Sequence, residues 1–502
     1  MGAAAAPWGS PLKNRRHLGS PAETNGVRPD PRQPHRAMPH LTAATCLVVV
    51  ALAGSLAAEN SPPPARVEIS LSVSGEIFAP SGEGSQPLRE PIDVTAAFDF
   101  VEAAGDAGSG TASRRYRRAT AVVRVGNRSD RITLAADARD VIVELVGTTP
   151  TPSLAASFLS RQEAELLDVP CDPILVPRLM PEGAVAKGDP WKVAADAVAG
   201  LLAIDTVSEG GIEVALIEAN EGTATLELTG TVTGAVDGVA TRITVKGTAR
   251  AACSAADTPD TWRIAGPIDR LDVTLAEHRE ASWVAPGLDV EATLTMSRSA
   301  PLDDDKHRLD PPAAGRPNGH GRAGTVWHRH PNGRYTLVLD RRWRVVEDGP
   351  EGLVMRLVDR GALIAQCSIL PLPRSAPDAA PTVEQVSRDV EASLADQFGH
   401  IAVADETTRD DGTRVVRVMA EGSAEERPFR WIHHLLADPA GHRSAVTFML
   451  EPPLEERFGG ADHELVAGLV LLADPVPGEP QKAADARPAR RAEKPASGRG
   501  TP

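Results

Sequence analysis

Apolar and polar side chains alternate with a period of two through most of residues 65–300. Val67, Ile69, Leu71 and Val73 begin this pattern, and it returns in the segments 121–125, 131–135, 141–146, 212–217, 224–233, 242–249, 270–277 and 288–297. A period of two is typical of strands with one solvated face. Glycine-containing turns at 126–127, 220–222 and 237–238 separate several of these runs. Long antiparallel strands joined by short turns predict a mainly β domain over residues 59–300, folded as a curved antiparallel sheet or half-barrel meander.

A short helical passage interrupts this first domain. Leu154, Phe158 and Leu166 lie near helical spacing within residues 153–167, and Pro170 ends the pattern. Residues 196–203 predict a further short helix or turn. We expect Trp191 to fill the core where the chain re-enters the sheet, rather than to contact a ligand.

A second domain is predicted over residues 325–475, after a Pro/Gly/Asp-rich linker at 301–324. Thr382 and Gln385 have the spacing of a capping box, and a helix is expected to follow with an apolar face of Val383, Val386, Val390, Leu394 and Phe398 and a stop at Gly399. Asp462 is expected to cap a closing helix whose inward residues are Leu465, Val466, Leu469 and Val470. Strand patterns fill the remainder, so the domain is predicted to be an α+β sandwich. Residues 476–502 form a basic Pro/Ala-rich tail that is predicted to be disordered.

The second domain resembles PsbP-like domains. The resemblance is carried by residues 335–343 (YTLVLDRRW), where the family has a strand ending in a P-x-x-W element, and by the helix that starts at Thr382. The turn at 441–443 into the strand at 445–448 and the final helix also match. Asp340 stands where the family usually has proline. The resemblance implies a PsbP-like α/β/α sandwich and an adaptor or assembly role, mostly without catalysis.

An uncharged apolar run at residues 41–58 follows a basic approach. Small residues at Ser55 and Ala57 lie where signal peptidase requires them, so residues 1–58 predict a basic leader and an export signal, with Met38 as an alternative translation start. We therefore expect the mature protein to be periplasmic or extracellular. The Arg/Ala/Gly/Pro bias is typical of a GC-rich genome and indicates a bacterial protein. The alternative is a protein tethered by an uncleaved N-terminal helix, since the run is close to the length that spans a bilayer.

Charge and cysteine usage restrict the partners. The chain has a net charge of −15 and only 3% aromatic residues, which disfavours nucleic acid. Cys171 and Cys253 fall in one domain and either pair or stay free, whereas Cys367 lies in an apolar strand pattern and is expected to be a buried thiol. The cysteines are too dispersed to suggest a metal site.

Three histidine motifs bear on metal binding. His320, His328 and His330 form the one histidine cluster; the His-x-His pair would place both rings on one strand face as zinc or copper ligands, but incidental solvated histidines are the favoured interpretation. His433 and His434 are adjacent on a strand and so should face opposite sides, one towards the core and one towards solvent. His463 and Glu464 begin like a zinc-protease motif, but the second histidine is missing from the helix.

Two further motifs carry a weaker signal. Residues 319–324 satisfy G-x-G-x-x-G, but a dinucleotide site needs that turn between a strand and a helix, and here it lies in the linker. Arg114-Arg115-Tyr116-Arg117-Arg118 is the densest basic patch. It could bind an anionic lipid or a cell-wall polymer, although a guard on a strand edge is the favoured interpretation.

No catalytic, cofactor-binding or metal-ligating residue is therefore predicted. We expect an exported, non-catalytic cell-envelope protein with a binding or assembly role, no cofactor, and an unknown partner that could be an envelope protein, a lipid or a cell-wall polymer. One alternative is a carrier of a lipid or other apolar ligand in the curved sheet. A second alternative is a hydrolase with an unrecognised site.

Overall fold

A computed structural model describes residues 63–78, 88–105, 110–220, 222–281, 286–301, 324–376 and 381–473. These residues all belong to one compact unit that begins at Pro62. The predicted export segment, nearly all of the predicted linker and the C-terminal tail lie outside the described residues. Within the described ranges, no helix is both long and apolar enough to cross a lipid bilayer.

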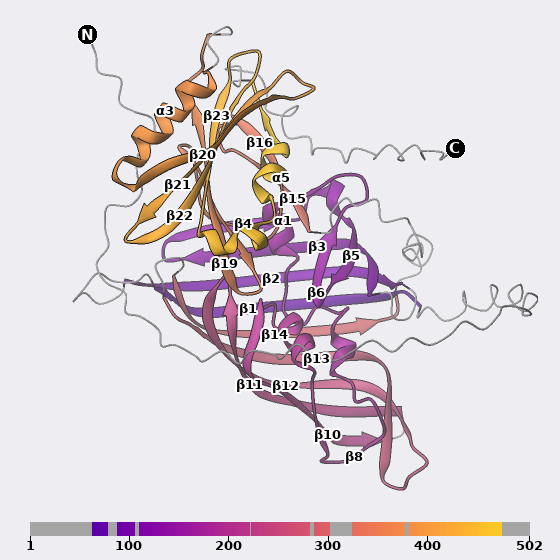
Figure 1. Ribbon diagram of the computed structural model, residues 1–502. Helices are drawn as coiled ribbons and strands as arrows, with labels where there is room; N and C mark the ends of the chain where they lie inside the picture. The colour runs from indigo at the N-terminus through magenta and orange to yellow at the C-terminus, as the bar shows by residue number, and fades with distance from the viewer. Residues whose placement is uncertain are drawn as a thin grey trace, which may run out of the picture. The chain divides into compact units, whose positions relative to one another are not determined.

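The first part of the chain forms a large antiparallel sheet of thirteen strands, as the alternation predicts (Figure 1). The hydrogen-bonded order is β6-β5-β3-β2-β1-β14-β13-β12-β11-β10-β9, so the sheet is open between β6 and β9, while β4 pairs with β3 and β8 pairs with β13. Bulges in β10, at the register shifts 207/209 and 216/218, locally increase the twist of the sheet. The strands are β1 (Ala65–Phe78), β2 (Arg89–Ala104), β3 (Thr111–Val125), β4 (Arg128–Thr133), β5 (Asp140–Val146), β6 (Thr149–Ser153), β8 (Val185–Ala186), β9 (Pro190–Lys192), β10 (Thr206–Asn220), β11 (Gly222–Val236), β12 (Val239–Ala255), β13 (Thr261–Arg279) and β14 (Gly287–Ser299).

Residues 153–205, here called the cover segment, pack on one face of this sheet. The segment contains α1 (Arg161–Leu166), α2 (Ala195–Leu201) and a 3-10 turn at Val176–Leu179. Its buried residues belong to the same core as the inward residues of the sheet. The largest fully buried side chains are Leu159, Leu175, Leu179 and Leu201 from the cover segment and Phe100, Leu216, Leu226, Leu228, Leu271 and Leu294 from the sheet. The apolar face of the sheet is therefore filled by the chain itself.

One expectation for the cover segment needs correction and a second is confirmed in part. The helix expected over 153–167 is limited to α1, because residues 149–153 form the edge strand β6, whose Pro150 and Pro152 fit an outer edge better than a helix. Helix α1 starts after Ser160, whose hydroxyl accepts a hydrogen bond from the backbone N–H of Glu163. Trp191 packs against the core, as expected, but it is only half-buried: it lies on β9 at the end of the sheet and donates from Nε1 to the carbonyl of Leu179 at 2.9 Å.

The second part of the chain forms two smaller sheets. One has the order β24-β16-β15-β7 and the other β17-β18-β19-β23-β22-β21-β20. Helix α3 (Val383–Leu394) packs its Val386, Val390 and Leu394 against Val418 and Trp431 of the seven-stranded sheet. The remaining elements are β7 (Leu159–Ser160), β15 (Thr325–Arg329), β16 (Tyr335–Asp340), β17 (Trp343–Gly349), β18 (Gly352–Asp359), β19 (Ala362–Leu372), β20 (Phe398–Thr408), β21 (Arg414–Ala424), β22 (Arg427–Ala437), β23 (Arg443–Leu450), α4 (Glu455–Phe458), α5 (Ala461–Ala467) and β24 (Leu469–Leu471).

The capping box at Thr382 is confirmed, but both helix ends expected in this part of the chain shift. Helix α3 stops at Leu394, because Ala395 adopts a positive φ of 45°, and Gly399 lies in β20. Helix α5 begins after Gly460 rather than at a cap from Asp462. It also ends at Ala467, so Leu469 and Val470 belong to a strand and not to the helix.

A seam joins the two parts of the chain. Leu159 and Ser160 of β7 pair in parallel with Val326 and Trp327 of β15, so the cover segment adds a strand to the C-terminal sheet. Arg161 at the start of α1 donates to the carbonyl of Trp343. Two ion pairs flank this junction: Arg341 Nη2 lies 2.6 Å from Asp168 Oδ2, and Arg344 Nε lies 2.8 Å from Asp237 Oδ1. The domain boundaries expected from the sequence stay predictions.

Candidate functional site

A cavity opens at the seam between the two parts of the chain. It has a volume of about 320 Å³ and is lined by Phe158, Thr325, Val338, Leu339, Asp340, Trp343, Glu464, Leu465, Ala467 and Gly468. We call it the seam cavity. The cover segment, β16, β17 and α5 all contribute side chains, so its walls come from both parts of the chain. A cavity of this size with mainly apolar walls is at the lower end of small-molecule sites.

Close packing fixes the walls of the seam cavity. Trp343, Leu339 and Leu465 are each at most 3% exposed, and the Trp343 ring lies 5.7 Å from that of Phe448. Gly468 allows α5 to approach β16, because a Cβ atom there would lie 2.0 Å from the carbonyl oxygen of Val338. The cavity is therefore held open by a rigid frame.

Two carboxylates provide the polar rim of the seam cavity. Asp340 accepts hydrogen bonds from the backbone N–H of Arg342 at 2.8 Å and from its Nε at 3.1 Å. Glu464 lines the cavity from the exposed side of α5. The position where the PsbP-like pattern has proline thus carries a carboxylate at the mouth of the cavity.

The dense basic patch does not act as one unit. Arg114 is 3% exposed and is held in a buried ion network, with its Nε 2.8 Å from Glu102 Oε2 and its Nη1 2.8 Å from Asp172 Oδ2. Arg115 pairs with Asp140 on the surface. Strand β3 pairs with β2 on one side and with β5 and then β4 on the other, so Arg114 and Arg115 do not lie on a sheet edge, whereas Arg117 and Arg118 lie in the short stretch between β5 and β4. Arg117 and Arg118 line a second, smaller cavity.

His328, in β15, and His330, directly after this strand, are buried rather than solvated. His328 and His330 share one face of the strand, as the His-x-His spacing predicts, and both rings lie near that of Tyr335, with centroids 6.4 and 4.9 Å away. Burial, together with the nearby charge of Arg161, lowers the pKa of His328 to about 4. His320 lies outside the described residues.

The rings of His328 and His330 are poorly placed for a metal. The backbone N–H of Asn332 donates to His330 Nδ1 at 3.2 Å, so the neutral ring carries its proton on Nε2 and presents a donor there. The neighbouring carboxylate, Asp348 Oδ1, is 3.6 Å from His328 Nε2. Across the described part of the chain, no group of three or more His, Cys, Asp or Glu side chains could hold a metal ion.

The expectation for His433 and His434 is wrong in one respect, because both are buried and neither faces solvent. His434 Nε2 lies 3.1 Å from Asp462 Oδ2, and Arg417 Nε lies 3.2 Å from the same oxygen. Burial opposes ionisation of Asp462, but these cationic and hydrogen-bonding partners lower its pKa to about 2. His463, which begins the protease-like motif, is exposed beside this pair.

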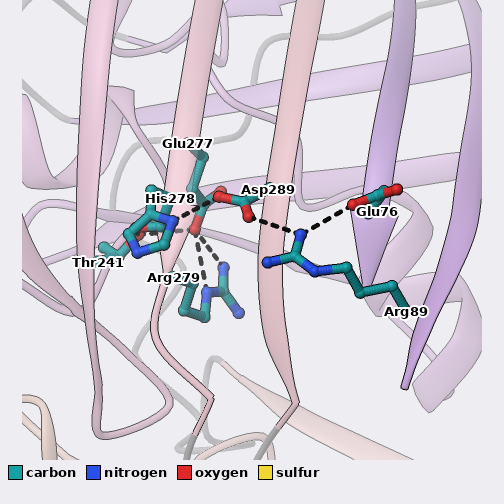
Figure 2. Close-up of polar contacts among 7 residues, drawn as sticks. All are labelled: Glu76, Arg89, Thr241, Glu277, His278, Arg279 and Asp289. Carbon is teal, nitrogen blue, oxygen red and sulfur yellow. Dashed lines mark hydrogen bonds and ion pairs between the residues drawn. The ribbon is translucent and has the colours of Figure 1, made fainter. Parts of the chain in front are cut away.

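A row of charged residues crosses four neighbouring strands of the large sheet, β2, β1, β14 and β13, near the strand ends (Figure 2). Arg89 lies 2.8 Å from Glu76 and 3.3 Å from Asp289, and His278 Nδ1 lies 2.5 Å from the other oxygen of Asp289. More than a third of each of these side chains is exposed. Solvated cross-strand pairs of this kind make a small contribution to the stability of a sheet, and salt screens it. The row is best explained as sheet stabilisation.

The cysteines and the glycine-rich motif supply no site in the described part of the chain. Cys171, Cys253 and Cys367 are separate buried thiols, so the alternative in which Cys171 and Cys253 pair is not the one observed. Burial raises the pKa of the Cys171 thiol to about 12. Residues 319–323 of the G-x-G-x-x-G motif lie outside the described residues, and Gly324 directly precedes a strand rather than a helix.

The sequence did not indicate the seam cavity. Its residues come from three distant segments, around 158, 325–343 and 464–468, and each segment has the pattern of ordinary core or turn. Trp343 stood out only as part of the PsbP-like pattern.

No protein-family model matches the chain, and no curated protein matches it. Among solved structures, cyanobacterial PsbP (CyanoP) from Synechocystis sp. PCC 6803 is 12% identical, with 32% of this chain and 98% of that chain covered and a TM-score of 0.26. A lipovitellin structure is 8% identical, with 51% of this chain and 27% of that chain covered and a TM-score of 0.26. With TM-scores of 0.26, neither likeness defines the fold or the function of this chain.

Proposed function

We propose that this protein is an exported, non-catalytic binding protein of the cell envelope, and that the seam cavity binds a small, mainly apolar molecule. The observation that carries the proposal is the seam cavity itself, whose aromatic and aliphatic walls are contributed by both parts of the chain. A ligand there would contact Phe158 of the cover segment and Trp343 of the C-terminal sheet at once. Burying apolar ligand surface against such walls contributes about 25 cal/mol per Å².

Export and the PsbP-like assignment are parts of this proposal. The apolar run at 41–58 supports export, and the element order of residues 325–475, with α3 on one face of an antiparallel sheet, supports a PsbP-like sandwich.

The seam cavity can be tested by occlusion. Ala467 is exposed at the cavity, so Ala467→Trp should fill it without disturbing the core. Ala440→Trp is the matched control, because Ala440 is an exposed turn residue that does not line the cavity. Purified full-length protein is extracted with organic solvent and analysed by native mass spectrometry, and an environment-sensitive apolar dye is titrated against each variant.

We expect co-purified small molecules or dye binding in the wild type and in Ala440→Trp, and their loss in Ala467→Trp. Equal binding by all three proteins would contradict the assignment of the seam cavity. Binding that survives Ala467→Trp and involves a lipid would favour the alternative, a carrier that uses the apolar face of the large sheet. That carrier would have to displace the cover segment, which fills the same face. The hydrolase alternative stays a prediction, without a supporting arrangement among the described residues.

A further inference from the structure

A second cavity lies where strand β3 changes its outer partner. Residues 111–115 of β3 pair with β5, and residues 120–125 pair with β4. Between these stretches, two backbone hydrogen bonds tie β3 to the loop at 134–139: Tyr116 N to Arg139 O at 2.9 Å and Leu134 N to Ala119 O at 3.0 Å. A cavity of about 150 Å³ opens at this point.

Three arginines line this opening, which we call the arginine cavity. Arg117 and Arg118 are consecutive on β3, and consecutive strand residues normally face opposite sides of a sheet. A bulge removes that constraint: Asp99 of β2 pairs with Arg118 and Phe100 pairs with Tyr116, which leaves Arg117 as the extra residue. Arg139 reaches the cavity from the loop before β5.

The floor of the arginine cavity is firm and its rim offers hydroxyl groups. Tyr116, Ala119 and Leu134 are buried in the core of the large sheet and line the bottom. Thr120 and Thr133 line it from β3 and β4. The backbone that carries the arginines is therefore held in place by the core of the large sheet.

Nearby carboxylates do not neutralise the whole cavity. The acid facing Arg118 across the strands is Asp99, whose two oxygens accept from Arg66 Nε at 3.0 Å and Arg66 Nη2 at 2.9 Å. These bonds, with the charges of Arg117 and Arg118, lower the pKa of Asp99. Within the described ranges, neither Arg118 nor Arg139 has an ion pair or a side-chain hydrogen bond.

We propose that the arginine cavity binds a phosphate group. Guanidinium groups bind phosphate through forked pairs of N–H donors. Arg118 and Arg139 line the cavity from two chain segments and can donate to a tetrahedral anion from two directions, whereas a planar carboxylate offers only two oxygens in one plane. The phosphate can belong to a lipid headgroup or be free in solution, since the recognising chemistry is the same. The arginine cavity shares no residue with the seam cavity, so it is a separate site.

The test compares two double variants with the same change in charge. Arg118→Gln with Arg139→Gln removes two arginines of the cavity. Arg124→Gln with Arg131→Gln removes two exposed arginines of β3 and β4 that do not line it. Inorganic phosphate is titrated calorimetrically into each full-length protein at low ionic strength. In a second arm, each protein is co-sedimented with phosphatidylcholine vesicles with or without phosphatidylglycerol.

Loss of a guanidinium–phosphate contact is worth at least about tenfold in affinity, so the cavity variant should bind at least about tenfold more weakly while the control variant changes by less than about threefold. If the wild type binds inorganic phosphate saturably and the cavity variant does not, free phosphate is a ligand. If the cavity variant differs from the wild type only in losing co-sedimentation with phosphatidylglycerol vesicles, the ligand is a lipid headgroup. The proposal is overturned if the wild type binds neither probe, or if both double variants lose binding equally. Arg118→Lys with Arg139→Lys keeps both positive charges and is the control for misfolding of the Gln variant. This variant should bind phosphate with an affinity between those of the wild type and the Gln variant.

Discussion

Arg114 and Asp172 form a bidentate ion pair inside the protein, with Nη1 2.8 Å from Oδ2 and Nη2 2.5 Å from Oδ1. Arg114 belongs to β3 of the large sheet and Asp172 to the cover segment, and both side chains are at most 3% exposed. Glu102 completes the network by bridging Arg114 and Arg298. The cover segment is thus fastened to the sheet by charge as well as by apolar packing.

Asp172→Asn should weaken the attachment of the cover segment to the large sheet. The variant leaves the buried guanidinium of Arg114 without its bidentate partner, and breaking one side of a buried pair costs about 3–5 kcal/mol. We expect a lower free energy of unfolding in urea and faster proteolysis within residues 153–205. A double variant, Arg114→Met with Asp172→Leu, should recover part of the loss because no charge is left unpaired. Unchanged stability in Asp172→Asn would show that the pair is not the fastening.

The extent of the β structure could be predicted from the sequence, because alternation is a local signal. Around Val67 and Leu71, successive residues alternate between the two faces of the sheet, so the position of a residue in the pattern gives the face on which it lies. Strands form in the segments in which this alternation occurs. The burial of His328 and of the Arg114 network could not be predicted. Each depends on a partner more than ten residues away, such as Asp348 or Asp172, and no period or spacing encodes that proximity. The bulge at Arg117 could not be predicted for the same reason, because it is defined by the pairing of β3 with β2.

Thr382→Ala tests a feature that the sequence did predict. The Thr382 hydroxyl accepts from the backbone N–H of Gln385, and the Gln385 side chain accepts from the backbone N–H of Thr382. Loss of such a cap costs about 1 kcal/mol. We expect Thr382→Ala to lower the free energy of unfolding by that amount and Thr382→Ser to restore it. A loss of equal size in both variants would mean that the methyl group, not the cap, matters.

The buried histidines should make the fold acid-sensitive. Burial lowers the pKa of His328 and of His433 to about 4 in the folded protein, whereas an unfolded histidine titrates near about 6.5. Between about pH 4 and about pH 6.5, the unfolded state therefore binds more protons than the folded state. The contribution of these two histidines to the free energy of unfolding is fully present above about pH 6.5 and falls as the pH drops towards about 4.

His433→Gln checks this sign. The variant should lose less stability than the wild type between pH 6.5 and 4, a difference of up to about 3 kcal/mol at 1.36 kcal/mol per pH unit. His278→Gln serves as the control, because His278 is exposed on the large sheet. Urea unfolding measured at several pH values gives both slopes, and equal slopes for wild type and His433→Gln would contradict the assignment.

Asp205, at the seam, is expected to make stability depend on pH in the direction opposite to that of the buried histidines, and Arg344 is expected to reduce this dependence. Its guanidinium lies between Asp237 and Asp205, with its Nη2 3.8 Å from Asp205 Oδ1. Burial and the neighbouring Asp237 raise the pKa of Asp205, and Arg344 opposes that rise. A raised carboxyl pKa gives a contribution to stability that is present at low pH and lost as the pH rises through the folded pKa.

Arg344→Gln removes the opposing charge, so the variant should be more destabilised at pH 7.5 than at pH 4. Adding Asp205→Asn should remove most of that difference, because the titrating group is gone. Urea unfolding of both variants at the two pH values measures this, and a loss from Arg344→Gln that is the same at both would show that its role is packing rather than charge.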